Sequence, residues 1–192
     1  SADLEVGYTG HLYPGKGMEI IPHVAEMCPW ANFHIVGGRE EHVEHWRNVL
    51  RSHENVFLYG AVPAQEVPAY IKALDVCLLP NQPQLHVYSR RGRKGTDIAP
   101  FTSPLKMFEY MAAKKPIIAS DLDVLKEVLS HGKNALLCKH DDRAWHAALE
   151  RLRQDQHLRD TLGKHALTDF EGKYEWHSRA GYILEKFESL DI

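Results

Sequence analysis

The sequence predicts an α/β protein with a doubly wound, mostly parallel sheet of about six strands, helices on both faces and a helical C-terminal tail. Two observations support this fold class. Short apolar runs alternate with segments of helical periodicity along most of the chain. The apolar runs do not alternate apolar and polar residues, which is typical of strands covered by helices on both sides. Right-handed crossovers would then place a ligand beyond the carboxyl ends of the strands.

Local patterns locate the individual elements. Strands are expected where apolar and β-branched residues run together, at residues 4–8, 33–36, 56–58, 76–79, 116–119 and 135–138. Helices are expected at residues 18–27, 40–52, 63–74, 104–113 and 124–129, followed by mostly helical segments to the end of the chain. The helix at 40–52 should bury Val43, Trp46, Val49 and Leu50. Residues 80–102 are predicted to form a long loop, and no internal repeat interrupts this order.

The composition is that of an ordinary globular protein and excludes several functional classes. The 192 residues are 44% hydrophobic and 26% charged, with a formal net charge of −3. This balance argues against a general nucleic-acid-binding protein. No apolar run approaches the roughly 18 residues that a membrane span needs. The chain has no signal peptide and no initiator methionine, so we expect a piece of a longer cytoplasmic protein.

The reactive side chains do not form a recognisable catalytic or metal motif. Cys28, Cys77 and Cys138 lie far apart and are expected to be reduced core thiols. His42 and His45 are three residues apart on a helix, but no H-E-x-x-H follows, so we predict no zinc site. A nucleophile elbow of the G-x-S-x-G type is also absent from the sequence.

The stretch from Thr102 to Ser120 is the most informative segment. Ser103 is expected to cap a helix, Pro104 to occupy its first position, and Leu105, Phe108, Met111 and Ala112 to form its packing face. The start of such a helix attracts phosphate through unpaired amides and a partial positive charge, and Lys106 lies in that first turn. Glu109, one turn further on, suits sugar hydroxyls. A phosphate and a ribose about one turn apart describe a nucleotide.

Two other segments are candidates for contact with anions. The loop Gly10–Gly17 is rich in glycine and precedes a helix, so its amides could approach a phosphate while Lys16 binds it. It is neither a Walker loop nor a dinucleotide fingerprint, and a tight turn with a solvated lysine remains an alternative. The basic residues Arg90, Arg91, Arg93 and Lys94 could meet phosphate, an anionic acceptor or a membrane, although a hydrated loop is the simpler interpretation.

Taken together, these motifs resemble the C-terminal domain of a retaining glycosyltransferase of family 4, which has the GT-B fold. The resemblance rests on G-H-L-Y-P-G-K-G at residues 10–17, G-x-V at 60–62, E-V-P-A-Y-I-K-A-L-D-V-C-L-L-P at 66–80, S-P-L-K-M-F-E-Y-M-A-A at 103–113 and P-I-I-A-S-D at 116–121. Gly132–Leu137, Leu162–Gly163, Ala166 and Trp176 continue it toward the C-terminus. All of these motifs in this order cover nearly the whole chain.

The resemblance implies a role for each matching residue. Lys16 would bind the donor diphosphate together with Gly10, Gly17 and the segment Ser103, Pro104, Leu105 and Lys106. Glu109 would bind the ribose, and Val62 would lie along the base. His11 stands where the family has an arginine, and Phe101 stands where it has the first glutamate of a paired motif. We expect His11 to contact the diphosphate and to bind it more tightly at acid pH.

The activity implied by the resemblance is transfer of a hexosyl group, with retention, from a UDP-sugar or GDP-sugar to an acceptor hydroxyl. No metal or other cofactor is implied, because cationic side chains and a helix terminus would stabilise the leaving diphosphate. Residues 1–173 would bind the donor nucleotide, and residues 174–192 would cross to an N-terminal domain outside this sequence. The acceptor would be a carbohydrate or a lipid-linked molecule, as in polysaccharide or glycolipid synthesis, with peripheral membrane contact by the longer protein. This chain alone would be inactive.

Two alternatives of different classes stay open at this stage. One is a GT-B nucleotide-sugar epimerase or a phosphorylase-like enzyme, since the same scaffold supports different chemistry. The other is a non-catalytic domain of flavodoxin-like topology that serves as an interaction module. Turnover of the donor without an acceptor would indicate the epimerase, and failure to bind any nucleoside diphosphate would favour the interaction module.

Overall fold

The computed structural model describes residues 3–83, 86–88, 94–97, 104–176, 178 and 180–181. Several sequence-based expectations fall outside these ranges, namely those on Arg90, Arg91, Arg93, Phe101 and Ser103, and most of the closing segment from Trp176 onward. The side chain of Lys94 is likewise outside the description.

A six-stranded parallel sheet in the order β3-β2-β1-β4-β7-β8 forms the centre of the fold, as predicted. Its strands are β1 (Leu4–Thr9), β2 (Ala31–Val36), β3 (Val56–Gly60), β4 (Val76–Leu79), β7 (Ile117–Ser120) and β8 (Leu136–Cys138). The first two strands pair along their full length, from Leu4 opposite Ala31 to Thr9 opposite Val36. The strand order reverses between β1 and β4, which is where doubly wound sheets bind ligands.

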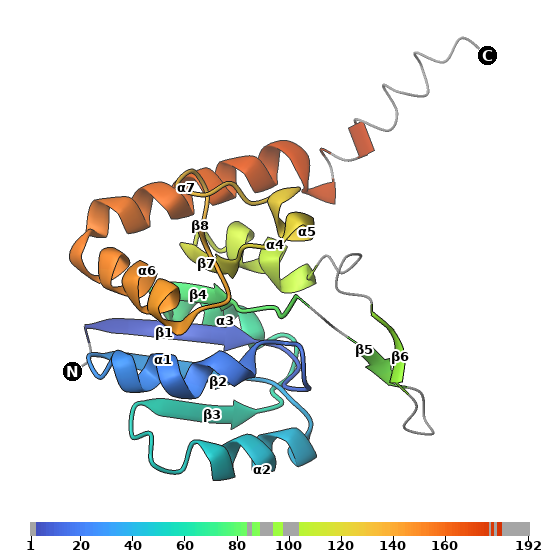
Figure 1. The fold of residues 1–192 in the computed structure, drawn as a ribbon. Coiled ribbons are helices and arrows are strands. Elements are labelled where there is room, and N and C mark those ends of the chain that lie inside the picture. Colours follow the sequence, from blue (N-terminus) through green and yellow to red (C-terminus); the bar gives the residue numbers. More distant parts are fainter. Residues whose placement is uncertain are drawn as a thin grey trace.

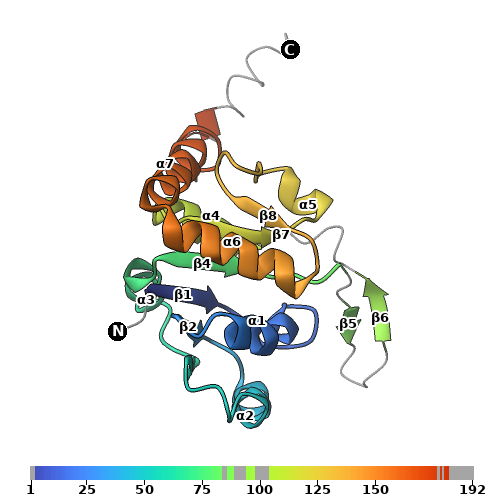
Figure 2. The same cartoon turned by 60° about the vertical axis from the view of Figure 1, so that its left-hand side comes forward.

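Helices cover both faces of the sheet (Figures 1 and 2). One face carries the 3₁₀ turn η1 (Met18–Ile20) with α1 (Ile21–Met27), α2 (Glu40–Val49) and α6 (Asp142–Gln154), whose apolar side chains share one buried cluster. The other face carries α3 (Val67–Ala73), α4 (Leu105–Ala112), α5 (Asp123–Lys126) and α7 (Gln156–Lys173), which share a second cluster. In β4, β7 and β8 alternating residues therefore contribute to two separate cores, whereas β1, β2 and β3 contribute apolar residues to the first cluster only.

Part of the segment predicted as a long loop is a small antiparallel pair. Strands β5 (His86–Tyr88) and β6 (Lys94–Asp97) pair with each other and not with the main sheet. The expectation of a continuous loop over residues 80–102 is therefore wrong for these seven positions. The runs are three and four residues long, and the second contains Gly95, so neither carries a strand signal of its own.

The start and the packing face of α4 differ from the prediction. Pro104 has ψ of 121°, so it precedes the helix, which begins at Leu105 and not at Pro104. The buried residues of α4 are Met107, Tyr110 and Met111, whereas Leu105 is 79% exposed. Apolar residues occur all around this helix, so periodicity alone did not determine which side meets the sheet. The same error occurs at Val49 of α2, which is 43% exposed.

All three cysteines are buried and free, as predicted. Burial raises the pKa of Cys28 to about 12 and that of Cys138 to about 12, so both thiols stay protonated at neutral pH. They belong to the core and not to a redox or catalytic site.

Candidate functional site

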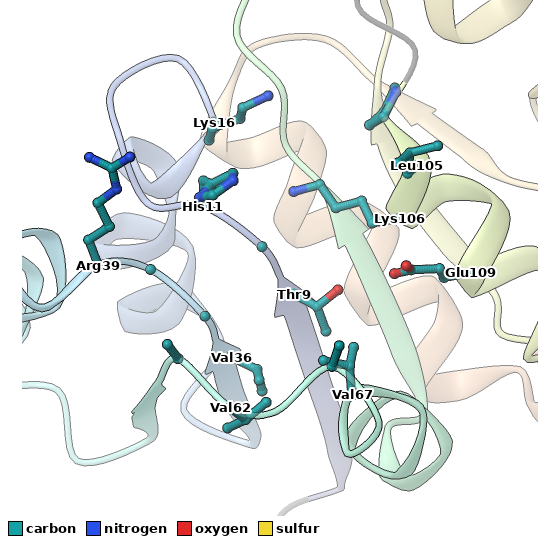
Figure 3. Close-up of a pocket in the computed structure, with 16 residues that line it drawn as sticks. Thr9, His11, Lys16, Val36, Arg39, Val62, Val67, Leu105, Lys106 and Glu109 are labelled. Carbon is teal, nitrogen blue, oxygen red and sulfur yellow. The ribbon is translucent and has the colours of Figure 1, made fainter. Parts of the chain in front are cut away.

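A cavity of about 660 Å³, here called the donor cavity, opens beyond the carboxyl ends of β1 and β2 and against the start of α4 (Figure 3). It is lined by Thr9, Gly10, His11, Lys16, Val36, Gly37, Gly38, Arg39, Ala61, Val62, Ala64, Val67, Pro104, Leu105, Lys106 and Glu109. Eight residues predicted from sequence thus meet at one cavity: Gly10, His11, Lys16, Val62, Pro104, Leu105, Lys106 and Glu109. Gly17 does not line it, and Ser103 is outside the described residues.

An internal carboxylate shapes the glycine-rich loop after β1. Glu19 accepts hydrogen bonds from the amides of Gly15 and Gly17, each at 3.1 Å. These two amides are therefore not available to an anion, contrary to the sequence-based expectation for the loop. Gly17 has a different function, since its φ is 95° and a Cβ there would overlap the carbonyl oxygen of Pro80. The loop is held in shape by the protein itself, and it contributes the backbone of Gly10 and the side chains of His11 and Lys16 to the cavity.

Close backbone packing at the ends of β1, β2 and β3 forms the floor of the donor cavity. The amide of Gly10 donates to Val36 O at 2.8 Å, and the amide of Gly37 donates to Gly60 O at 2.6 Å. Gly37 has φ of 115°, and a Cβ there would overlap Gly10 O. Sequence reasoning did not assign Gly37, Gly38 or Arg39 to the site. The available signal was the Gly-Gly pair that directly follows an apolar strand.

Tyr110, in the second half of α4, joins this helix to the end of β1. Its hydroxyl accepts a hydrogen bond from the Thr9 amide at 2.8 Å and lies 3.1 Å from Thr9 Oγ1. Burial holds the pKa of Tyr110 well above its usual value, so the hydroxyl stays protonated. This contact between residues 101 positions apart sets the distance between the two sides of the cavity. No sequence motif predicted it.

Cationic side chains gather at one end of the donor cavity. His11, Lys16 and Arg39 come from the strand-end loops, and Lys106 reaches toward them from α4 (Figure 3). The Nζ of Lys16 lies 5.3 Å from the ring centroid of Tyr13. Burial, followed by the charges of Lys16, Lys106 and Arg39, lowers the pKa of His11 below 6.5, so its imidazole is neutral at pH 7. Among the lining residues, Lys16, Arg39 and Lys106 thus accompany a single carboxylate, that of Glu109.

Lys106 is the most constrained of these cations. Its Nζ is buried, lies 3.5 Å from the centroid of the Tyr8 ring, and has no hydrogen-bond partner among the residues that the structure describes. Burial, and then the charge of Lys16, holds the pKa of Lys106 well below 10.5, while Glu109 acts weakly in the opposite direction. A buried polar group without a partner is uncommon in folded proteins and calls for an explanation.

The rest of the cavity suits the other parts of a nucleotide. Val36, Val62 and Val67 form an apolar end away from the cations (Figure 3). Glu109 lies one turn into α4, is exposed, and lines the same space. An anionic group at one end, an apolar ring at the other and hydroxyls near the carboxylate would match this distribution of side chains.

No group of three or more His, Cys, Asp or Glu side chains within the described ranges could hold a metal ion. Among the helices of the described part of the chain, none is both long and apolar enough to cross a membrane.

Comparison with known families defines the class of protein. The family described as "Glycosyl transferases group 1" matches residues 3–155. Because this match covers well over half of the sequence, the chain belongs to the group 1 glycosyltransferase family. A search of curated protein sequences found no match.

Solved structures with the same fold include several glycosyltransferases. HepE from Anabaena, in complex with UDP and glucose, is 19% identical with a TM-score of 0.74 over 97% of this chain and 48% of HepE. Sucrose-phosphate synthase from Thermosynechococcus elongatus is 22% identical, with a TM-score of 0.77 over 99% of this chain and 46% of the synthase. The C-terminal domain of LpcC from Francisella tularensis is 16% identical, with a TM-score of 0.69 over 91% of this chain and 88% of that domain.

These likenesses define the part of the enzyme that the sequence corresponds to. The chain spans about half the length of HepE and of sucrose-phosphate synthase, and nearly the whole of the isolated LpcC domain. It therefore has the fold of the C-terminal half of a GT-B glycosyltransferase.

Proposed function

We propose that this chain is the donor-binding half of a retaining glycosyltransferase that transfers a hexosyl group from a nucleoside-diphosphate sugar to an acceptor hydroxyl. The observation that carries the proposal is the donor cavity, which combines a cationic end, a helix start and an apolar end beyond the carboxyl edge of the sheet. Membership in the family and the fold shared with HepE, solved in complex with UDP-glucose, support it.

Within this proposal, Lys16 and His11 bind the diphosphate at the cationic end, together with Lys106 and the amides of Ser103 and Leu105. They stabilise the charge that develops on the departing nucleoside diphosphate. Glu109 accepts hydrogen bonds from the ribose, and the backbone beside Val62 lies along the base. Gly10 keeps the loop backbone close to the cavity, while Gly17 acts through the loop's shape. The donor is a UDP-sugar or a GDP-sugar, and no metal is required.

The acceptor and the remaining catalytic groups come from a second domain in this proposal. Residues 174–192 would cross from the donor-binding domain, residues 1–173, to an N-terminal domain of similar architecture. That domain would bind a carbohydrate or lipid-linked acceptor in the cytoplasm, with peripheral membrane contact by the complete enzyme. The 192-residue chain would then bind the donor but transfer nothing.

A thermal-shift panel with UDP, GDP, ADP, CMP and NAD tests the donor site. A ligand at 100 times its Kd adds about 2.7 kcal/mol of stability, which raises Tm by several degrees for a domain of this size. We expect one nucleoside diphosphate to stabilise the chain, and Glu109→Ala to reduce this effect. Glu171→Ala, on the exposed side of α7, serves as the matched control. If none of the diphosphates shifts Tm, the proposal fails and the interaction module becomes the better explanation.

A further inference from the structure

The buried amine of Lys106 has a local environment that does not suit a permanent positive charge. Its Nζ is shielded from solvent, and no described residue offers it a hydrogen bond. An isolated charge in such a place is costly, and an amine avoids the cost by releasing its proton. The Tyr8 ring, with its centroid 3.5 Å from Nζ, provides the only close electrostatic attraction from β1 among the described contacts.

The charged groups that act on Lys106 have opposite signs, and the cation has the larger effect. Lys16 faces it from the glycine-rich loop and disfavours its charged form, while Glu109, on its own helix, favours that form more weakly. A charge on Lys106 would in turn lower the pKa of His11, so the two side chains lie close enough to act on each other. Thr9, which lines the same cavity, is engaged with Tyr110. Without an added anion, the burial and the charges around Nζ therefore disfavour the protonated form of Lys106.

The geometry around Nζ indicates which kind of group would stabilise the protonated form of Lys106. Lys106 points from the second position of α4 into the space that His11 and Lys16 enter from the opposite side (Figure 3). A Cβ added to Gly10 would lie 3.3 Å from Nζ, so the glycine keeps this space open to the amine. The eight-residue helix α4 directs its first amides toward the same region. An anion between the two sides would contact all of these groups.

We propose that Lys106 is uncharged in the empty donor cavity and becomes an ammonium, held between the Tyr8 ring and the diphosphate, when a nucleoside diphosphate binds. The proposal rests on the proposed function, because it needs the diphosphate at this end of the cavity. The proton is taken from the solvent. Lys106 is then the residue that makes the site prefer a free nucleoside diphosphate, the more highly charged product, over its sugar ester.

This assignment has a measurable consequence for the free protein and for the complex. The pKa of Lys106 is depressed in the empty cavity and rises when the diphosphate is bound, so protons are taken up between these two pH values. Within that window the affinity for the diphosphate falls as pH rises. Above about pH 8 the phosphate and an ordinary imidazole are both largely deprotonated, so uptake there identifies a lysine.

Titration calorimetry of the 192-residue chain with UDP, GDP and ADP tests the proposal. Each titration is run between about pH 6.5 and 9.5 in buffers of different ionisation enthalpy, which measures the protons taken up per ligand bound. We expect uptake on the alkaline side of neutrality with the diphosphate that binds. Lys106→Arg should bind without this uptake because its guanidinium is always charged. Lys106→Met should bind about 10- to 100-fold more weakly, as expected for loss of a charge-assisted hydrogen bond.

Three controls separate this proposal from other sources of protons. His11→Gln should keep the alkaline uptake, and Lys164→Met, an exposed lysine on α7 outside the cavity, should match the unmodified chain. The nucleoside of the diphosphate that binds (uridine, guanosine or adenosine), which has no phosphate, should bind the chain and Lys106→Met equally. Diphosphate binding without proton uptake above about pH 8, or uptake above that pH that persists in Lys106→Arg, overturns the proposal and leaves the proposed function intact. Failure of every nucleoside diphosphate to bind overturns both.

Discussion

The donor cavity has a neighbour with which it shares Val36 and from which it differs in chemistry. The second cavity, about 460 Å³ and here called the aromatic cavity, lies on the α3 side of the sheet over β1, β2 and β3. It is lined by Glu5, Asn32, His34, Val36, Phe57, Tyr59, Tyr70, Ala73 and Leu74. Aromatic rings and polar groups are plentiful there, so composition alone would make it an attractive ligand site.

The polar groups of the aromatic cavity satisfy one another. His34 Nε2 lies 2.5 Å from Glu5 Oε2, and His34 Nδ1 lies 2.8 Å from Tyr59 Oη. Asn32 donates to Glu5 Oε1 at 3.2 Å. The imidazole also stacks on Phe57, with ring centroids 5.4 Å apart. These contacts form a closed network that needs no ligand.

The donor cavity shows the opposite arrangement, because its buried lysine lacks a partner within the described part of the chain and its cations face one another. The difference teaches that an unsatisfied group identifies a binding site better than the number of polar or aromatic residues does. Four predictions test this comparison, from the largest expected effect to the smallest.

Gly37→Ala should disrupt the floor of the donor cavity. The added methyl group would overlap Gly10 O at a φ of 115°, and the overlapped atoms are backbone, so no change of side-chain rotamer relieves the contact. We expect a loss of about 2–4 kcal/mol of unfolding free energy, measured by urea denaturation, and loss of stabilisation by UDP. Gly172→Ala, in α7 with open space around its Cα, is the control and should be neutral or slightly stabilising. Equal stability of the two variants would contradict the packing described for the strand ends.

Lys16→Met should weaken diphosphate binding without changing the fold. Loss of one charge-assisted hydrogen bond costs about 1.5–3 kcal/mol, so the Kd for the bound diphosphate should rise about 10- to 100-fold by calorimetry. The unfolding free energy should stay within about 0.5 kcal/mol of its original value, because Lys16 makes no buried pair. Unchanged affinity would remove Lys16 from the donor site.

His34→Phe should affect stability and not ligand binding. The substitution keeps a ring between Phe57 and Tyr59 but leaves Glu5 and the Tyr59 hydroxyl without their imidazole partner. Both groups are partly exposed, so we expect a loss of about 1 kcal/mol in chemical denaturation. The Kd for UDP should not change. A tenfold higher Kd would show that the aromatic cavity takes part in donor binding, contrary to the contrast drawn between the two cavities.

His11→Gln should produce the smallest effect, a flatter dependence of diphosphate affinity on pH in mildly acid solution. In the empty cavity the pKa of His11 lies below 6.5, and a bound dianion raises it. The imidazole therefore takes up a proton between these two values, and affinity weakens severalfold as pH rises through the higher one. Calorimetry of the unmodified protein and of His11→Gln across about pH 5.5–8.5 separates the contribution of His11 from the phosphate's own titration, which is the same for both proteins. Identical profiles would exclude contact between His11 and the diphosphate.

Local sequence patterns were sufficient for the order of the main elements. The six parallel strands and the major helices follow from short apolar runs and from helical periodicity, because each pattern reflects the covering of one element by its neighbours. The position of the donor cavity also followed, since parallel strands bring the loops after β1 and before α4 to the same edge. Eight of the ten predicted site residues line that cavity.

Only the tertiary structure decided the state of the groups within the site. It assigned the amides of Gly15 and Gly17 to Glu19, turned Leu105 outward, and buried the amine of Lys106 over the Tyr8 ring. These outcomes depend on which side of α4 meets the sheet and on contacts between residues up to 101 positions apart. Burial and pairing are sums over neighbours that are distant in sequence, so a local pattern can name the reactive side chains but cannot determine their charge or their partners.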